Sequence, residues 1–211
     1  MTNSLTFIDQ FNFALTSGLP GEAAHRLLSP INRPLTSSAL KEFENYRKSA
    51  VSILLFKKDN SIHCILTQRK KYDGAHSQQV SFPGGKMDLS DVDLEYTARR
   101  ESFEEIMLPK EHGILISELS DIYIPVSRFI VKPFVFYIDE LPKLKAEERE
   151  VDEIFSFDIF RLLENEAIQT TDIKLAKGIR KNVPYFSINN KVVWGATAMI
   201  LSELREILKR F

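Results

Sequence analysis

The sequence predicts an α/β/α sandwich around a mixed sheet, preceded by an N-terminal helical extension. Three observations point to this fold class. Apolar runs of strand length alternate irregularly with amphipathic runs of helix length, as expected for one sheet covered by helices. A Pro-Gly-Gly turn lies between a short apolar run and a helical segment rich in glutamate. The 211 residues, 44% of them apolar, suit a single domain with a sizeable core.

Residues 1–48 are expected to form a helical cover that packs on a core domain at 49–211. Apolar residues recur at helical spacing from Phe7 to Leu15, and glycine and proline then stop this helix. A second short helix is expected from Glu22 to Leu28, before Pro30 breaks regular structure. The apolar stripe of these helices is too small to fold alone, so the segment should lie against the core.

Strand-like runs, rich in β-branched and aromatic residues, account for most of the core domain. Strands are expected at Ala50–Phe56, His63–Arg69, 79–82, Asp121–Val126, Ile130–Ile138, Val151–Phe157, Val183–Ile188 and Lys191–Trp194, and helices at Leu94–Leu108 and Ala196–Lys209. Tight turns at Asp59-Asn60 and Asn189-Asn190 should join two of the strand pairs as hairpins. Pro133, inside its strand, predicts a sheet edge or a bulge.

Composition and charge exclude several classes of protein. A formal net charge of -1, without a basic stripe, argues against nucleic acid or an anionic membrane as partner. The N-terminus lacks the pattern of a signal peptide, and no apolar run reaches the roughly 18 residues of a membrane span. The single cysteine, Cys64, forms no intrachain disulfide, which fits a cytoplasmic protein. A homodimer is compatible with all of these features.

Three glutamates, Glu101, Glu104 and Glu105, fall within a sector of about 100° on one predicted helix. Carboxylates this close repel one another unless a cation offsets them, and a hard divalent ion takes oxygen ligands. Arg100, four residues before Glu104, can hold that carboxylate by a charge-assisted hydrogen bond. By themselves, the three glutamates also fit a solvated helix face.

Gly84 and Gly85 precede this helix. Because glycine has no Cβ, the backbone can turn sharply there and approach a metal ion or a phosphate closely. A plain turn is the alternative interpretation of the two glycines. Asp88 and Asp91, in the following loop, fit either metal binding through water or a role at the helix N-terminus.

Together these residues resemble the box of the Nudix hydrolases, which cleave diphosphates linked to another moiety. The matching positions are Gly85, Asp91, Arg100, Glu101, Glu104 and Glu105. Asp91 stands where the box has glutamate, and eight residues rather than seven separate it from Arg100. Met107 replaces a glycine that ends the helix in the family, and Pro109 is expected to take over part of that role.

Further residues resemble the coenzyme A pyrophosphatase branch of this superfamily. They are Leu66, Thr67, Arg69, His76, Phe82, Asp88, Asp91, Thr97 and Ala98, with the later runs "IPVSRFIVKPFVF" and "WGATAMILSEL". The chain departs from the coenzyme A signature of that branch at Lys70, Asp73-Gly74 and Gln78. The resemblance covers most of the chain and implies a Nudix-type α/β/α sandwich.

The resemblance also implies a mechanism. It gives metal-binding roles to the three helix glutamates and an orienting role to Arg100, with Mg²⁺ or Mn²⁺ as cofactor. The metal ions would neutralise the diphosphate and lower the pKa of the attacking water. In this superfamily a carboxylate on a distant loop often serves as general base, and Glu150 or Glu153 fits that role.

The expected substrate is a small-molecule diphosphate, with coenzyme A or a derivative as first choice. Gly84 and Gly85 would face this substrate. The basic cluster Arg69-Lys70-Lys71 would meet the 3'-phosphate of coenzyme A, and His76 would contact substrate or hydrogen-bond within its loop. The alternatives are hydrolysis of ADP-ribose, NADH or a nucleoside triphosphate, and a module that binds a nucleotide without hydrolysing it. The presence of all three helix glutamates favours an enzyme.

Overall fold

The computed structural model describes residues 6–30, 33–42, 45–70, 79–175 and 178–211. The strands are β1 (Arg47–Lys58), β2 (Ser61–Arg69), β3 (Val80–Ser81), β4 (Gly84–Lys86), β5 (Ile114–Glu118), β6 (Ile122–Ile124), β7 (Phe129–Ile138), β8 (Val151–Asp158), β9 (Ile168–Leu175), β10 (Gly178–Ile188) and β11 (Lys191–Trp194). The helices are α1 (Phe7–Leu15), α2 (Gly21–Leu27), α3 (Thr36–Glu42), α4 (Leu94–Ile106) and α5 (Gly195–Leu208), with a 3-10 turn, η1 (Ile159–Leu163).

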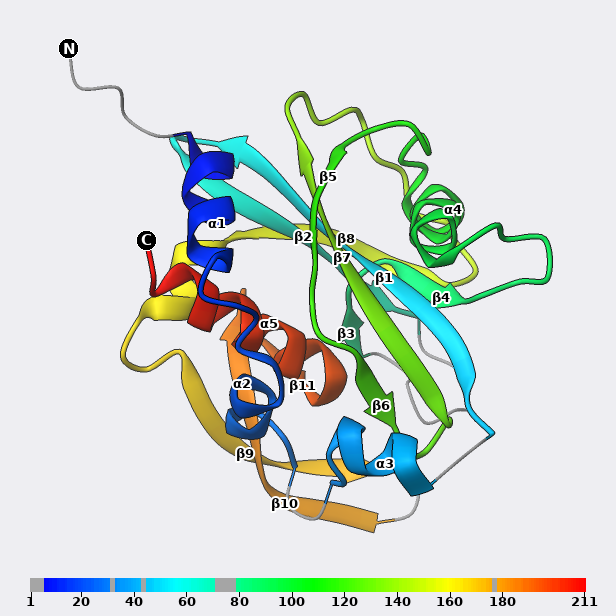
Figure 1. Ribbon diagram of the computed structural model, residues 1–211, viewed down its shortest axis with the longest axis vertical. Helices are drawn as coiled ribbons and strands as arrows, with labels where there is room; N and C mark the ends of the chain where they lie inside the picture. Colours follow the sequence, from blue (N-terminus) through cyan, green and yellow to red (C-terminus); the bar gives the residue numbers. More distant parts are fainter. Residues whose placement is uncertain (1–5, 31–32, 43–44, 71–78, 176–177) are drawn as a thin grey trace.

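The strands form two sheets (Figure 1). The larger has eight strands, with the order β3-β2-β1-β7-β5 along its main path. In addition, β4 pairs with β1, β6 with β7 and β8 with β2. The smaller sheet is antiparallel, with the order β11-β10-β9. In the larger sheet β1 and β7 run parallel and the other pairs are antiparallel, so this sheet is mixed, as predicted.

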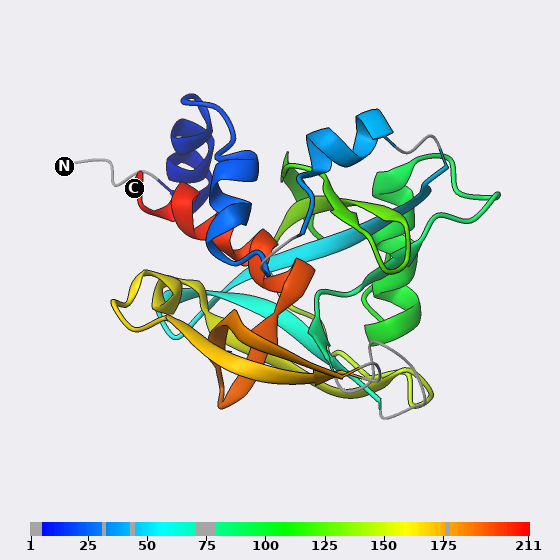
Figure 2. The same cartoon turned by 90° about the horizontal axis from the view of Figure 1, so that it is seen from below.

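The two faces of the large sheet bury separate cores, with α4 on one side and α1 and α5 on the other (Figure 2). Along β1, Ile53 and Leu55 pack with α1 and α5. Leu54 and Phe56 pack beneath α4. This alternation follows from strand geometry, because successive side chains point to opposite faces. The predicted α/β/α sandwich is thereby confirmed.

Most of the expected elements form where the sequence places them. α1, α2, α4 and α5 agree with the predicted helices to within one or two residues at each end. Asp59-Asn60 and Asn189-Asn190 join the predicted hairpins, and all four residues have positive φ between 48° and 62°. Such values are those of the tight turns that fit the twist of paired strands.

Five elements, α3, β4, β5, β9 and η1, have no counterpart among the predicted ones. α3 buries only Thr36 and Ala39, which is too few for a recognisable helical period. The sequence of β5, ILISE, shows no regular alternation of apolar and polar side chains, and none of its residues is fully buried. β9 belongs to the small second sheet, whose existence the sequence did not indicate.

Pro133 was predicted at a sheet edge or a bulge. It lies in an interior strand, so the edge is wrong, whereas the pairing of β5 with β7 is irregular nearby, with a register shift between Leu115 and Ser117. On the side of β7 away from β1, β6 pairs with Phe129–Val131 and β5 with Phe134–Tyr137. Pro133 therefore stands opposite the gap between β6 and β5, where its carbonyl accepts a hydrogen bond from Leu119 N at 2.9 Å. The missing N–H of proline is tolerated there because no strand partner requires it.

A buried carboxylate connects the N-terminal helices to α5. Glu203 is 0% exposed and accepts hydrogen bonds from Gly21 N at 3.0 Å, Ser120 N at 3.1 Å and Ser120 Oγ at 2.7 Å. The Nε2 atom of His25 lies 3.0 Å from Oε2 of Glu203, the oxygen that also accepts from Ser120 N. Burial alone would raise the pKa of Glu203, but the bonds from His25 and Ser120 outweigh it and lower this pKa. The charge is thus satisfied, and it fixes α2 against the core.

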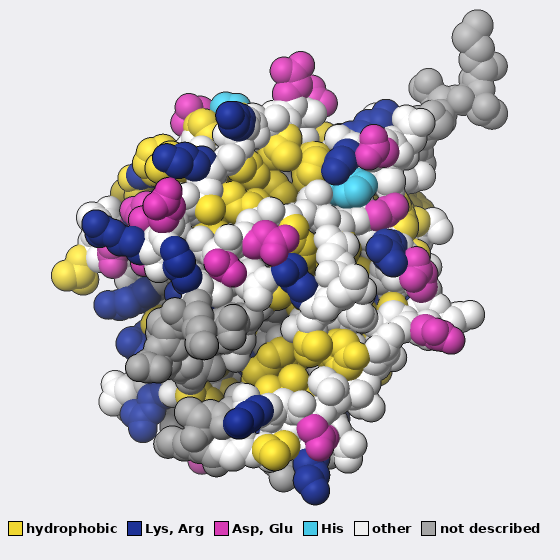
Figure 3. All heavy atoms as spheres, turned by 180° about the vertical axis from the view of Figure 1, so that it is seen from behind, with side chains coloured by type: hydrophobic (Ala, Val, Ile, Leu, Met, Phe, Trp, Pro, Cys, Tyr) yellow, Lys and Arg dark blue, Asp and Glu magenta, His cyan; other side chains and the backbone are white. Residues whose placement is uncertain are grey.

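The surface agrees with the nearly neutral composition. Acidic and basic side chains are interspersed over the face shown in Figure 3. None of the helices in the described ranges is long and apolar enough to cross a bilayer.

Candidate active site

The two glycines form a strand rather than only a turn. β4 pairs with β1, so that Gly84 lies opposite Val51 and Gly85 opposite Ala50. A Cβ on Gly84 would collide with the Ala50 carbonyl and lie 2.6 Å from Val51 Cα. A Cβ on Gly85 would lie 2.5 Å from the Glu101 carboxylate. Glycine is required at both positions because backbone approaches one of them and a carboxylate the other.

Gly85→Ala is expected to reduce turnover far more than stability. The new Cβ meets only the flexible end of Glu101, so that carboxylate must move while β4 stays paired. Turnover should fall about tenfold or more, and the free energy of unfolding by less than about 1 kcal/mol. Gly84→Ala is the contrasting variant, since its Cβ meets backbone atoms of β1 and should cost more than about 2 kcal/mol. Urea unfolding with steady-state kinetics checks both, and equal stability losses would contradict this account.

Residues at both ends of α4 fix its position over the sheet. Asp93 caps the N-terminus by accepting a hydrogen bond from Tyr96 N at 2.7 Å. Met107 ends the helix in the left-handed conformation, with φ 56°, and donates its N–H to the Phe103 carbonyl. Methionine itself adopts the conformation for which the box has glycine. The helix-ending role thus falls to Met107 rather than to Pro109.

Arg100 links the loop before α4 to the glutamates on the helix. Its Nε and Nη2 atoms each donate to one oxygen of Asp91, both at 2.9 Å. Its Nη1 atom donates to Glu101 and to Glu104, both at 2.9 Å, as the spacing of Arg100 and Glu104 predicted. Nη2 also reaches the Lys86 carbonyl at 3.0 Å. The bond to Asp91 contributes most to a pKa of Arg100 above its usual value, so this cation stays charged.

Asp91 positions Arg100. It is 7% exposed, and the guanidinium of Arg100 holds the pKa of this carboxyl well below its usual range. Its Oδ2 atom also accepts hydrogen bonds from Thr97 Oγ1 and Asp88 N, both at 2.9 Å. Asp88 itself is more exposed, with its carboxylate 4.0 Å from Arg100. The sequence left the role of Asp91 open, because only the fold brings its two oxygens against one guanidinium.

Glu105 is a buried carboxylate with weak compensation. It is 4% exposed, Gly84 N donates to its Oε2 atom at 3.3 Å, and Arg69 Nη1 lies 3.8 Å from Oε1. Burial raises the pKa of Glu105 to about 8, and the charges of Glu101 and Glu150 act in the same direction against Arg69. A positive ion at this position would favour the charged carboxylate.

The helix glutamates fit a hard divalent cation. Burial also raises the pKa of Glu101, which stands one turn before Glu105 on α4. Within the described ranges, no three or more His, Cys, Asp or Glu side chains are already gathered as a metal site, and Arg100 bridges Glu101 and Glu104. The candidate ligand atoms are nevertheless carboxylate oxygens. For Glu101 and Glu105, burial disfavours the charged carboxylate unless a cation compensates it. Glu101, Glu104 and Glu105 could therefore hold Mg²⁺ or Mn²⁺.

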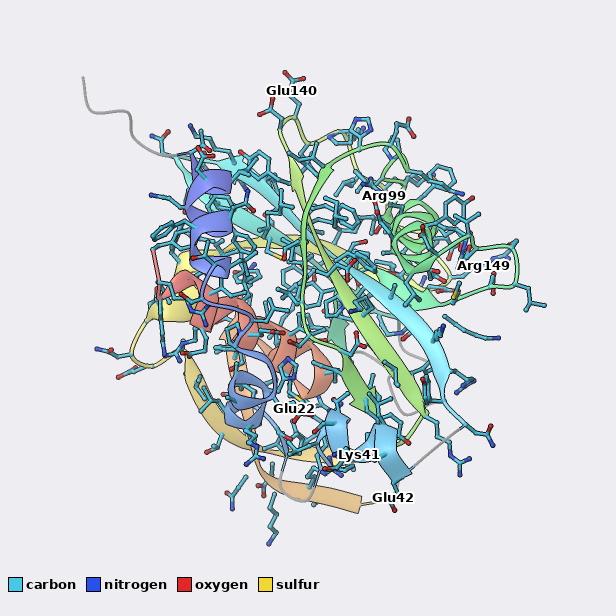
Figure 4. The ribbon with its side chains drawn as sticks, in the orientation of Figure 1. Glu22, Lys41, Glu42, Arg99, Glu140 and Arg149 are labelled. Atoms are coloured by element: carbon cyan, nitrogen blue, oxygen red, sulfur yellow. The ribbon has the colours of Figure 1, made fainter. Side chains whose placement is uncertain are left out.

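The loop before β8 brings Glu150 to the same carboxylates. The backbone N–H of Glu147 donates to the Glu105 carbonyl at 2.9 Å, which caps the last turn of α4. Figure 4 shows Arg149, the residue before Glu150, beside this helix. The charge of Glu150 raises the pKa of both Glu101 and Glu105, so Glu150 acts electrostatically on these two helix carboxylates.

Glu153, the other candidate for general base, has a different partner. Lys191 Nζ lies 2.8 Å from its Oε2 atom and also donates to Gln68 Oε1 at 2.6 Å. This ion pair joins β8 to β11. The charge of Glu150 raises the pKa of Glu101 and Glu105, whereas the charge of Glu153 is paired with Lys191.

The structure separates the members of the predicted basic cluster. Arg69 lies beside Glu105, whereas Lys70 Nζ donates to the Glu148 carbonyl. Lys71 and the predicted substrate residue His76 lie outside the described residues. No sequence pattern signals the approach of Arg69 to Glu105, because this approach depends on how β2 and α4 pack.

Comparison with known proteins decides the family. A family model for the NUDIX domain matches residues 46–180, which include β4, α4 and Glu150. The chain belongs to the Nudix family. The prediction of a Nudix-type hydrolase, a pyrophosphatase, is thereby confirmed. Nudix hydrolases generally depend on divalent metal ions.

Two curated relatives of this Nudix chain illustrate the match. It is 34% identical over 139 residues to the human mitochondrial coenzyme A diphosphatase NUDT8, covering 64% of this chain and 58% of NUDT8. It is 32% identical over 160 residues to the uncharacterized Nudix hydrolase NudL of Enterobacter sp. (strain 638), covering 76% of this chain and 82% of NudL. The match thus spans less than two thirds of the human relative.

Solved Nudix structures share the fold. The NUDIX domain of Shewanella oneidensis NrtR, complexed with ADP ribose, has a TM-score of 0.53 at 12% identity, covering 83% of this chain and 99% of that domain. The MutT protein of Methanosarcina mazei Go1 has a TM-score of 0.52 at 14% identity, covering 80% and 99%. At such identities the likeness shows the fold alone.

Proposed function

We propose that this Nudix protein is a cytoplasmic, metal-dependent hydrolase that cleaves the diphosphate of coenzyme A or its derivatives, with 49–211 as catalytic core. The observation that carries hydrolysis is the group of three carboxylates, Glu101, Glu105 and Glu150, beside a glycine strand. The choice of coenzyme A is supported by the residues that resemble the coenzyme A pyrophosphatase branch and by the similarity to NUDT8. The complete set of helix glutamates favours catalysis over binding alone.

The helix glutamates and Arg100 would form the metal-binding part of the site. Glu101, Glu104 and Glu105 supply carboxylate oxygens for Mg²⁺ or Mn²⁺. When bound, the cation supplies positive charge that neutralises the diphosphate and polarises its phosphorus–oxygen bonds. Arg100 keeps two of the glutamates in place, and Asp91 fixes its guanidinium.

The remaining residues act on water and substrate. Glu150 accepts a proton from the attacking water, whose oxygen bonds to one phosphorus. The bond from that phosphorus to the bridging oxygen breaks, and the bridging oxygen leaves with the second phosphoryl group. Gly84 and Gly85 let the diphosphate approach the backbone of β4. Arg69, beside Glu105, provides positive charge for the same diphosphate, and His76 remains a proposed substrate contact.

Glu150→Gln is expected to lower kcat by about 10²-fold or more, the usual contribution of a general base, with KM little changed. Glu153→Gln is the matched control, since it makes the same change at a carboxylate paired with Lys191. It should leave kcat within about threefold of the wild type, because exposed ion pairs contribute little. Steady-state kinetics at saturating Mn²⁺ measures both. A large loss in Glu153→Gln with normal turnover in Glu150→Gln would reverse the assignment.

A turnover panel tests the substrate. It compares coenzyme A, acyl-coenzyme A, ADP-ribose, NADH and nucleoside triphosphates, each with Mg²⁺ and with Mn²⁺. We expect the highest kcat/KM with coenzyme A or its acyl derivative. A preference for ADP-ribose, NADH or a triphosphate would assign the chain to that alternative. Tight nucleotide binding without any turnover would indicate a binding module.

A further inference from the structure

The turn that carries Glu150 is held by the side chain of Glu147 (Figure 4, where Arg149 in this turn is labelled). The Oε2 atom of Glu147 accepts hydrogen bonds from the backbone N–H groups of Arg149 at 2.8 Å and Glu150 at 3.1 Å. The carbonyl of Glu147 accepts from Glu150 N at 3.2 Å and from Val151 N at 2.9 Å. Two backbone N–H groups of the turn therefore depend on this one carboxylate.

The backbone of Glu147 also ties the turn to the helix of the proposed metal ligands. Its N–H donates to the Glu105 carbonyl at 2.9 Å, and Lys145 N donates to the Ile106 carbonyl at 3.1 Å. Both carbonyls belong to the last turn of α4, where the C=O groups of a helix lack partners within the helix. Glu147 thus contacts α4 through its N–H and the turn of Glu150 through its side chain.

Strand pairing holds the other side of the turn without fixing it completely. Lys70 N donates to the Glu150 carbonyl at 2.9 Å, just before β8 begins at Val151. Between Gln68 and Arg69, however, the register of β2 against β8 shifts. Such an irregularity interrupts the ladder and redirects nearby side chains. The regular ladder therefore does not by itself determine the direction of the Glu150 side chain.

We propose that Glu147 is the positioning residue for Glu150 and acts through the turn that its carboxylate holds. This inference rests on the proposed function, because it takes Glu150 as the general base. A general base must lie within hydrogen-bond reach of the water from which it accepts a proton. The carboxylate bonds of Glu147 restrict the exposed Glu150, and its N–H bond sets this turn relative to Glu105.

Single substitutions at position 147 test the carboxylate. Glu147→Ala removes both side-chain bonds but keeps the N–H that donates to Glu105. We expect kcat to fall about tenfold with KM within about twofold of the wild type, because the displaced group acts on water. Glu147→Gln should recover most of this loss, since an amide oxygen accepts the same two bonds. Steady-state kinetics at saturating Mn²⁺ measures both variants.

Glu148→Ala is the matched control. Within the described part of the chain, Glu148 makes hydrogen bonds only through its backbone, where its carbonyl accepts from Lys70 Nζ. The substitution keeps that carbonyl and removes a carboxylate next to Glu147. The variant should keep the kcat of the wild type, so a tenfold loss in Glu147→Ala is not the effect of any lost charge in this loop.

A double variant decides whether Glu147 acts through Glu150. In Glu150→Gln no base is left to position, so adding Glu147→Ala should lower kcat by less than about twofold further. A role in the fold alone would instead give the same loss in both backgrounds. Calorimetric titration with Mn²⁺ should give the wild-type affinity for Glu147→Ala, because the bond to the Glu105 carbonyl is kept.

Amide hydrogen exchange, followed by NMR, tests the turn without turnover. The N–H of Arg149 donates to the carboxylate of Glu147. Its exchange should be about tenfold faster in Glu147→Ala and close to the wild-type rate in Glu147→Gln. Unchanged exchange in Glu147→Ala would overturn the proposal, because the carboxylate would then not hold the turn.

The kinetic outcomes separate this inference from the proposed function. Wild-type kcat in Glu147→Ala, or an equal loss with and without Glu150→Gln, would overturn the positioning role alone. Normal turnover in Glu150→Gln would overturn the assignment of the general base and, with it, this inference. The single variant Glu150→Gln therefore identifies a failure of the proposed function.

Discussion

Glu105→Gln is expected to lower turnover by about 10³-fold, roughly 4 kcal/mol in the activation barrier. Glutamine keeps the size of the side chain but removes the charge that a divalent cation requires. Without metal, the variant should be as stable as the wild type or more stable. Glu105 is buried with a pKa raised to about 8, so near neutral pH its carboxylate, charged in the unfolded chain, must take up a proton on folding, and a neutral amide avoids this cost. Steady-state kinetics and urea unfolding in chelator measure the two effects.

Glu95→Gln is the matched control for this prediction, because it changes the same type of residue on the same helix. Glu95 pairs with Arg99 at 2.9 Å and is not one of the proposed metal ligands. Calorimetric titration with Mn²⁺ should show weaker binding in Glu105→Gln and unchanged binding in Glu95→Gln. Near-normal turnover together with wild-type Mn²⁺ affinity in Glu105→Gln would refute the metal assignment.

Arg100→Met should lower both stability and activity. Removing the guanidinium leaves the buried carboxylate of Asp91 unpaired, which typically costs about 3–5 kcal/mol. It also releases Glu101 and Glu104 from the positions in which Arg100 holds them, so turnover should fall by about 10²-fold or more. Urea unfolding and steady-state kinetics provide the two readouts.

A second substitution separates these two effects of Arg100. The double variant Arg100→Met with Asp91→Asn also removes the buried charge that Arg100→Met alone leaves unpaired at position 91. Most of the lost stability should return, whereas turnover should stay low because Glu101 and Glu104 still lack their donor. A double variant with normal turnover would show that Arg100 serves the fold alone.

Local patterns predicted the parts of the site that depend on one helix. The spacing of Glu101, Glu104 and Glu105 placed them on one face, and the four-residue interval predicted the bond from Arg100 to Glu104. These contacts follow from helix geometry, which sequence spacing determines directly. The hairpin turns at Asp59-Asn60 and Asn189-Asn190 were predictable for the same reason.

Contacts between distant segments were not predictable in this way. Arg69 meets Glu105 through the packing of β2 and α4, and no local pattern records that approach. The choice between Glu150 and Glu153 depends on a backbone bond from Glu147 to α4 and on the place of Lys191 in the other sheet. As two glutamates three residues apart, they fit the role of general base equally well in the sequence. Only the packing of the strands and loops distinguishes them.

The most direct test of the central claim is product identification from coenzyme A. The purified protein is incubated with coenzyme A and Mg²⁺ or Mn²⁺, and the products are identified by mass spectrometry. We predict equal amounts of 4'-phosphopantetheine and adenosine 3',5'-bisphosphate, formed only with the divalent cation and abolished by a chelator. Intact coenzyme A after incubation with folded, metal-loaded protein would contradict the account, as would the same products forming at an undiminished rate in chelator.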